Sequence, residues 1–120
     1  NSSDAFLNRL LDQFDCDVLL CTHTGIKWHR ALGGRRHVIN VGALGRPEND
    51  GTQNVWYTSL RPEGSELQVD FVPVEYEAER LAFEMRREGL PDEFIETTLT
   101  GWWTTCLEVL PARERSKGIH

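Results

Sequence analysis

The stretch from 17 to 30, DVLLCTHTGIKWHR, holds the side chains of this sequence that are best suited to chemistry. An aliphatic run ends there in Thr22-His23-Thr24-Gly25. Imidazole binds metal ions and exchanges protons near neutral pH, and the carboxyl ends of strands in α/β sheets form the rim where ligands bind. Gly25 would let the backbone approach a ligand closely. His23 is therefore a candidate ligand-binding residue, although a lone histidine after a strand is more often a hydrogen-bonded structural residue.

The elements that would position His23 are predicted from hydrophobic spacing. Apolar residues recur along one face over 3–15, behind a polar capping sequence, and predict an amphipathic helix. The continuous apolar run over 17–22 predicts a short strand covered on both faces. A helix followed at once by a buried strand indicates an αβ unit of a layered α/β protein.

The next part of the chain is expected to be mainly β structure. In chain order, the sequence predicts a polar connection from Thr24, a hairpin turn over 31–36, a strand over 37–41, a turn-rich loop over 42–51, and a hairpin of two runs, 54–60 and 66–72. The pattern then becomes helical. One helix is expected over 75–88, ended by Gly89, and a second from Pro91 to near Gly101. An apolar segment over 102–110 is expected to pack across the domain.

Charge is unevenly distributed along the 120 residues. Residues 1–60 carry equal numbers of acidic and basic side chains, so the net charge of −6 belongs entirely to residues 61–120. This acidity argues against a general nucleic-acid binder, whose affinity comes from a basic surface; nucleic acid enters only as a candidate substrate. The basic residues of the first half gather between 27 and 46, where they form either an anion-steering patch or an ordinary solvated loop.

Three further features concern the cellular context and the length of the protein. The longest aliphatic run is far shorter than the ~20 residues of a membrane span, so no membrane association is expected, and the first residues lack the layout of a signal peptide. Cys16, Cys21 and Cys106 show no CxxC spacing and are interpreted as reduced thiols of a cytoplasmic protein. The chain begins at Asn1 and its only methionine is Met85, so we expect it to be part of a longer protein.

Several short motifs, in this order, resemble those of the calcineurin-like metallophosphoesterases, above all the small bacterial and archaeal phosphodiesterase-like branch. Residues 22–25 resemble the family's Gly-His-Thr/Ser-His loop, 40–43 its Asn-Pro-Gly-Ser loop, and 45–47 its Gly-Arg/Gln-Pro turn. The resemblance covers residues 3–75, and 91–110 looks like a helical tail seen in some relatives. It implies an α/β fold, part of a four-layer α-β-β-α sandwich in which two packed β-sheets are flanked by helices.

The resemblance also implies that this chain is half of a domain. The family's Asp-x-His, Gly-Asp-x-x-Asp and Gly-Asn-His-Asp/Glu motifs precede the histidine loop, and none occurs in this sequence. Residues 1–120 are therefore expected to be the C-terminal half of a metallophosphoesterase domain, with a helical tail from about residue 91. The expected partners are a phosphate-ester substrate and the missing N-terminal half, or further copies in a homo-oligomer. Alone, the chain is expected to be inactive.

For the intact protein, the resemblance implies metal-dependent hydrolysis of phosphomonoesters or phosphodiesters. The implied cofactors are divalent metal ions, two in the intact protein or only one, drawn from Mn, Fe, Zn and Ni, with His23 as a metal ligand. Gly25 stands where the family has a second histidine ligand, which leaves His29 as a candidate substitute ligand and favours the alternative, a non-catalytic binding or scaffolding protein. The residues implied to lie near the substrate are Thr24, Arg30, Asn40, Gly42 and Arg46.

Other chemical interpretations of these residues are weaker. A cysteine within a buried strand is usually inert, so Cys21 is a poor candidate nucleophile. A zinc site can be drawn, but its spacing matches no structural zinc pattern; its ligands would come from Cys21, His23, His29 and His37. Tryptophans can stack on a nucleobase, although packing is their commoner use; the chain has Trp28, Trp56, Trp102 and Trp103.

Overall fold

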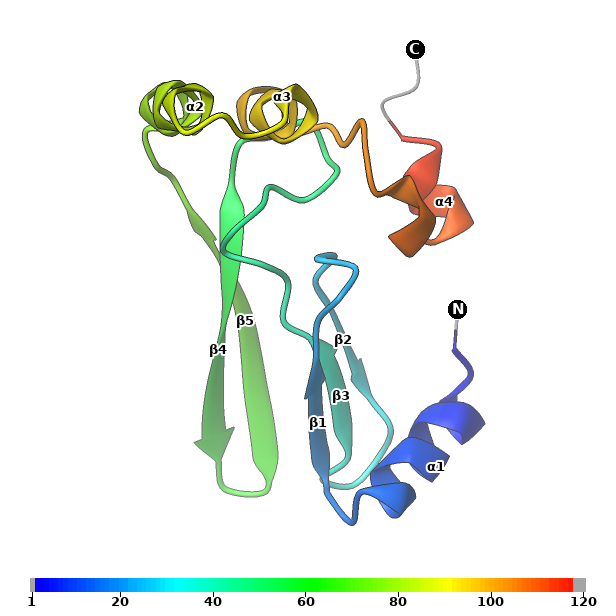
Figure 1. Cartoon of the computed structure of the whole chain (residues 1–120). Helices are drawn as coiled ribbons and strands as arrows, with labels where there is room; N and C mark the ends of the chain where they lie inside the picture. Colours follow the sequence, from blue (N-terminus) through cyan, green and yellow to red (C-terminus); the bar gives the residue numbers. More distant parts are fainter. Residues whose placement is uncertain (1, 118–120) are drawn as a thin grey trace.

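The computed structural model describes residues 2–117, and its helices and strands follow the predicted order with three additions. The elements in chain order are α1 (Asp4–Gln13), β1 (Val18–Cys21), β2 (Trp28–Ala31), β3 (His37–Asn40), β4 (Val55–Glu63), β5 (Glu66–Val74), α2 (Ala78–Arg87), α3 (Asp92–Thr100), a 3₁₀ turn η1 (Leu107–Val109) and α4 (Ala112–Arg115) (Figure 1). The additions are the short helices η1 and α4 near the C-terminus and the strand β2, which lies where the sequence predicted a polar connection. Of these, β2 matters most for the first sheet. It becomes a strand because β3 offers it an antiparallel partner, which local polarity does not reveal.

Helix α1 packs on one face of a three-stranded sheet. The Ser3 hydroxyl caps α1 by accepting a hydrogen bond of 3.3 Å from the Phe6 N–H. In the sheet, β3 lies between β1 and β2, parallel to β1 and antiparallel to β2. Leu7 and Leu11 of α1 pack against Val38 of β3, and each such burial contributes roughly 1.5–3 kcal/mol to folding. All four residues of the central strand β3 are buried.

The expectation that β1 is covered on both faces is wrong for residues 2–117. Side chains alternate along a strand, and Leu19 packs with the α1 core while its neighbours point to the other face. On that face Val18 remains 37% exposed and Leu20 49% exposed. The strand is therefore covered by α1 on one side and bears an apolar, solvent-facing surface on the other.

Strands β4 and β5 form a second, two-stranded antiparallel sheet (Figure 1). Their pairing runs from Val55–Val74 to Glu63–Glu66, so the hairpin is longer than the predicted runs. Only Gly64 and its neighbour form the loop, and the φ of 62° at Gly64 is the left-handed value that a two-residue hairpin turn requires.

The hairpin is joined to the first sheet just beyond the end of β3. The Thr58 hydroxyl donates a hydrogen bond of 2.9 Å to the Val41 carbonyl. The Trp56 N–H donates one of 3.2 Å to the Ala43 carbonyl. These bonds tie the loop after β3 to β4, so the second sheet helps to hold the predicted motif at 40–43 itself.

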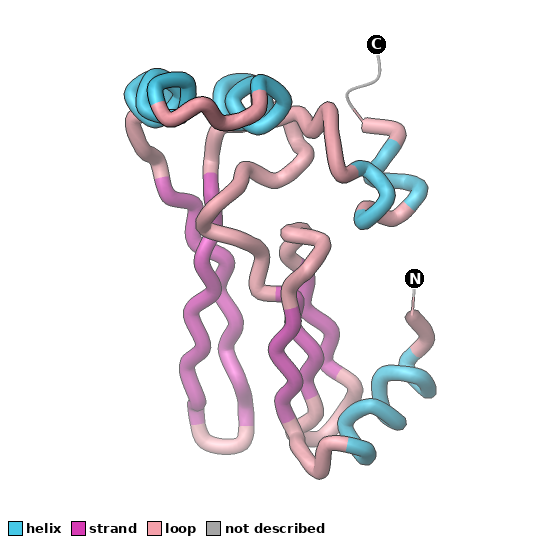
Figure 2. Tube along the Cα trace, in the orientation of Figure 1, coloured by secondary structure: helices cyan, strands magenta, loops and turns pink. Residues whose placement is uncertain are grey.

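The two predicted C-terminal helices are present as α2 and α3. They pack against each other and lie together at one end of the hairpin (Figure 2). Ala82 of α2 and Ile95 of α3 are buried, and Gly101 ends α3 with a left-handed φ of 72°. Two β-sheets with helices beside them make this a mixed α/β fold, as the sequence predicted. Among residues 2–117, no helix combines the length and apolar character needed to cross a bilayer.

Candidate functional site

A cavity of about 600 Å³ lies where the parallel strands β1 and β3 end. Cys21 and Asn40, the last residues of these strands, both line it. We call it the strand-end cavity. Its lining residues are Ser2, Leu7, Cys21, Thr22, His23, Thr24, Ile26, Lys27, Trp28, His29, Arg30, Asn40, Pro111, Arg113 and Glu114. The rim position predicted for His23 is therefore where the structure has a cavity of ligand-binding size.

His23 stands in this cavity with an unusual backbone. Its φ is 111°, a left-handed value that a residue with a side chain adopts only at a cost of about 1–3 kcal/mol. Hydrogen bonds on either side of it hold the loop: the Thr22 hydroxyl donates to the Gly42 carbonyl at 2.8 Å, and the Thr24 hydroxyl accepts from the Ile26 N–H at 3.3 Å. Strain of this kind, imposed by the surroundings, is common at functional sites.

Asn40 joins the histidine loop to the loop after β3. It is only 3% exposed, and its amide nitrogen donates to the Thr24 hydroxyl at 3.0 Å. Its amide oxygen accepts from the Gly42 N–H at 3.2 Å. The structure thus brings together three residues that the resemblance placed near the substrate. Thr24 and Asn40 line the cavity, whereas Gly42 supports it through the backbone.

His29 is paired with His37. Nε2 of His29 lies 2.9 Å from Nδ1 of His37, and the rings stack with centroids 5.2 Å apart. One ring must donate and the other accept, so the bond exists only while at least one imidazole is neutral. Burial lowers the pKa of His29 from its ordinary value, and the neighbouring His37 lowers it further. As a candidate metal ligand, His29 therefore has only Nδ1 uncommitted.

The His29–His37 pair predicts a pH-dependent stability. Because the pKa of His29 is lower in the folded protein than its ordinary value of 6.5, the unfolded chain takes up a proton first as the pH falls. The free energy of unfolding should be fully retained above pH 6.5 and should decline below it. His29→Gln, which has no titrating ring, should make the decline shallower. Urea denaturation at a series of pH values measures this, and an unchanged decline in the variant would contradict it.

Arg46 lies on the other side of the histidine loop. Its guanidinium stacks on the Trp103 ring at 3.5 Å and donates a hydrogen bond of 3.1 Å to the Thr105 carbonyl. Burial lowers the pKa of Arg46, and the nearby Cys106 opposes that shift. Arg46 and His23 both line a separate cavity of about 370 Å³. The structure therefore places Arg46 next to the histidine loop but not in the strand-end cavity.

Arg30 and Lys27, two further basic residues of the cavity, are engaged in ion pairs. Arg30 donates to the Asp4 carboxylate at 3.2 Å and to the Ser2 carbonyl at 2.6 Å. Lys27 forms an ion pair with Glu48. The Lys27 ammonium also lies over the Trp56 ring, 3.6 Å from its centre.

Sequence reasoning missed Lys27 and Arg113 as cavity residues. Lys27 was seen only as a member of the basic cluster. For Arg113 no sequence signal existed, because it lies about ninety residues along the chain from the histidine loop.

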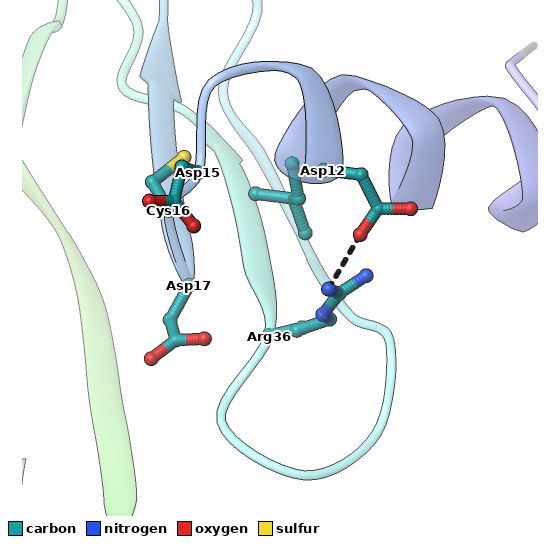
Figure 3. A pocket seen from close by; sticks show the side chains of 6 residues that line it. Asp12, Asp15, Cys16, Asp17 and Arg36 are labelled. Carbon is teal, nitrogen blue, oxygen red and sulfur yellow. Dashed lines mark hydrogen bonds and ion pairs between the residues drawn. The ribbon is translucent and has the colours of Figure 1, made fainter.

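A cavity of about 290 Å³ lies at the opposite end of β1 and is not part of this site. It is lined by acidic residues and a cysteine (Figure 3); they are Asp12, Asp15, Cys16 and Asp17, with Leu11 and Arg36. Arg36 donates to the Asp12 carboxylate at 2.6 Å and so ties the β2–β3 turn to α1. The ion pair between Arg36 and Asp12 in this cavity therefore has a structural explanation, the attachment of the β2–β3 turn to α1.

Residues 2–117 do not by themselves form a metal centre. Among them, no group of three or more His, Cys, Asp or Glu side chains is placed to hold a metal ion. The zinc site that could be drawn from Cys21 and three histidines is therefore not assembled here. If His23 is a ligand, it supplies a single imidazole, and a divalent ion bound there would need further ligands from outside residues 2–117.

Comparisons with known proteins bear on the fold. No family model and no curated protein matches the sequence. The fold is similar to that of a metallophosphoesterase from Sphaerobacter thermophilus, known from a crystal structure, with a TM-score of 0.61 and 22% sequence identity. The match covers 76% of this chain and 45% of that one. The chain thus has a metallophosphoesterase-like fold and spans less than half of the protein that it matches.

Proposed function

We propose that this chain is part of a metal-dependent phosphoesterase that hydrolyses phosphomonoesters or phosphodiesters, and that it supplies one histidine loop to the active site. The observation that carries the proposal is His23, held at a φ of 111° in a cavity at the carboxyl ends of β1 and β3. It stands there in a fold shared with a metallophosphoesterase. A strained histidine at the rim of such a sheet is well suited to hold a ligand.

The proposal assigns the remaining metal ligands to the N-terminal half of the same domain. In such enzymes divalent ions, of Mn, Fe, Zn or Ni, supply a nucleophilic hydroxide and neutralise the phosphate. The residues of this chain position the site. Asn40 and Thr22 hold the loop that carries His23 through hydrogen bonds. Thr24 and Arg30 line the same cavity and would lie near the substrate.

Two observations support the proposed half-domain. The chain spans 45% of the metallophosphoesterase that it resembles in structure. β1 is an outer strand of its sheet, and two of its own apolar side chains, Val18 and Leu20, are exposed. An unpaired strand edge beside apolar surface is normally covered in a native protein. The N-terminal half is the proposed cover, and a homo-oligomer is the alternative.

The test uses the intact protein and the variant His23→Ala. We expect metal-dependent hydrolysis of bis-p-nitrophenyl phosphate with Mn²⁺ to fall about 100-fold or more, and the bound metal per protein to fall with it. His29→Ala tests the substitute ligand: a matching loss of bound metal would assign His29 as a second ligand, and unchanged metal content would exclude it. Unchanged activity and metal content in His23→Ala would remove His23 from the site.

A second candidate is a non-catalytic binding or scaffolding protein, and Gly25 is the observation that favours it. The φ of 68° at Gly25 is a left-handed value that favours glycine, although a Cβ built there would lie at an ordinary packing distance of 3.6 Å from the Trp103 ring. The loop is thus shaped for glycine where the family has a histidine ligand. If the intact protein binds metal but hydrolyses no phosphoester with any of the four ions, this second candidate replaces the first.

A further inference from the structure

The outer wall of the strand-end cavity comes from the C-terminal segment. Pro111, Arg113 and Glu114, at the start of α4 and within it, line the cavity together with Ser2 and Leu7. Figure 1 shows α4 near the N-terminal end of α1. The segment is fixed to the domain: buried Asn49 donates a hydrogen bond of 2.9 Å to the Glu114 carbonyl, and Leu110 is 2% exposed. The wall is therefore a built part of the fold.

The charges around the cavity single out Arg113. Of the charged side chains that line it, Lys27 pairs with Glu48, Arg30 with Asp4, and Glu114 with Lys117. Arg113 takes part in none of the ion pairs formed among residues 2–117. Its guanidinium is therefore the cation with hydrogen-bond donors to spare for a ligand.

Part of the remaining wall is apolar. Leu7 and Ile26 line the cavity together with Trp28 and Pro111. A ligand that fills such a cavity gains from burying an apolar group as well as from meeting a charge. A free inorganic ion would leave this surface unused.

We propose that the strand-end cavity binds a phosphate ester whose organic part is a flat apolar ring, with Arg113 contacting the phosphate and Ile26 and Trp28 contacting the ring. The proposal rests on the proposed function, since it names the substrate class of that site. A guanidinium suits this task because its planar fork can meet two phosphate oxygens at once. The cavity volume of about 600 Å³ is sufficient for such a molecule.

The test measures binding without turnover. The intact protein, kept free of metal by a chelator, is titrated with phenyl phosphate, inorganic phosphate and phenol, and binding is followed by calorimetry. Phenyl phosphate should bind about tenfold more tightly than either fragment, because it uses both parts of the cavity. Equal affinity for phenyl phosphate and inorganic phosphate, or no binding of phenyl phosphate, would overturn the proposal.

Arg113 variants test its assigned contact. Arg113→Ala should weaken phenyl phosphate binding about fivefold and leave phenol binding unchanged, whereas Arg113→Lys should lose less. Arg35→Ala, an exposed arginine in the β2–β3 turn, is the matched control and should bind like the wild type. An Arg113→Ala variant with wild-type affinity would refute the contact.

The binding result separates this proposal from the proposed function. If metal-free protein binds phenyl phosphate but the metal-loaded protein hydrolyses no phosphoester, only the enzymatic proposal fails. If hydrolysis is found while Arg113→Ala binds phenyl phosphate normally, only the contact proposed for Arg113 fails.

Discussion

Replacing Gly101 with alanine is expected to lower the free energy of unfolding by more than about 3 kcal/mol. Gly101 ends α3 with a φ of 72°, and a Cβ built there would lie 2.1 Å from the carbonyl oxygen of Thr52 and 2.4 Å from its amide nitrogen. Both neighbours are backbone atoms, so they cannot rotate away as a side chain could. Relief would require the two segments to separate, with loss of the 3.2 Å hydrogen bond from the Gly51 N–H to the Gly101 carbonyl. Chemical denaturation of the purified variant measures the effect.

Gly89→Ala is the matched control for this prediction. Its φ is also 72°, but a Cβ built there meets nothing within 4 Å. The Gly89→Ala substitution should therefore lower the free energy of unfolding by only about 1–2 kcal/mol, the usual penalty for a left-handed residue with a side chain. The difference in the free energy of unfolding between the two variants measures the effect of the close approach of Gly101 to Thr52. Equal losses of stability would show that this close approach does not make Gly101 harder to replace.

Replacing Trp103 with alanine is expected to cost about 3–5 kcal/mol of stability. The side chain is 8% exposed, and its indole N–H donates a hydrogen bond of 2.8 Å to the Pro47 carbonyl. Its ring stacks on the Arg46 guanidinium at 3.5 Å, and its backbone N–H donates to Asn49 at 2.9 Å. The change would leave a cavity, an unpaired carbonyl and a half-buried cation without its ring.

The same variant should also weaken the strand-end cavity. Trp103 anchors the segment that leads to α4, and its ring lies close to Gly25 in the histidine loop. Binding of phenyl phosphate should therefore fall in Trp103→Ala at temperatures where the variant is still folded. Trp103→Phe keeps a ring but loses the hydrogen bond, and should cost only about 1–2 kcal/mol. A Trp103→Ala variant as stable as Trp103→Phe would contradict the role given to the ring.

Local patterns predicted most of the secondary structure. The helix at 3–15, the hairpin at 54–72 and the helices at 75–88 and beyond Pro91 are all present, with shifted ends. Each rests on spacing within a dozen residues, on capping residues or on turn-forming glycines. The errors occurred where a distant segment decides the outcome. β2 exists because β3 pairs with it, and Val18 is exposed because α1 covers only the opposite face of β1.

The sequence by itself determined the order of motifs, the placement of His23 directly after a strand, and through these the metallophosphoesterase-like fold. Only the tertiary structure decided which further residues surround His23. It showed that Arg113 lines the cavity, that His29 is committed to His37, and that Arg46 stacks on Trp103. The physical reason is that a strand, a turn or a cap is stabilised by neighbours at fixed spacing along the chain, whereas these contacts join segments whose separation follows no repeating rule.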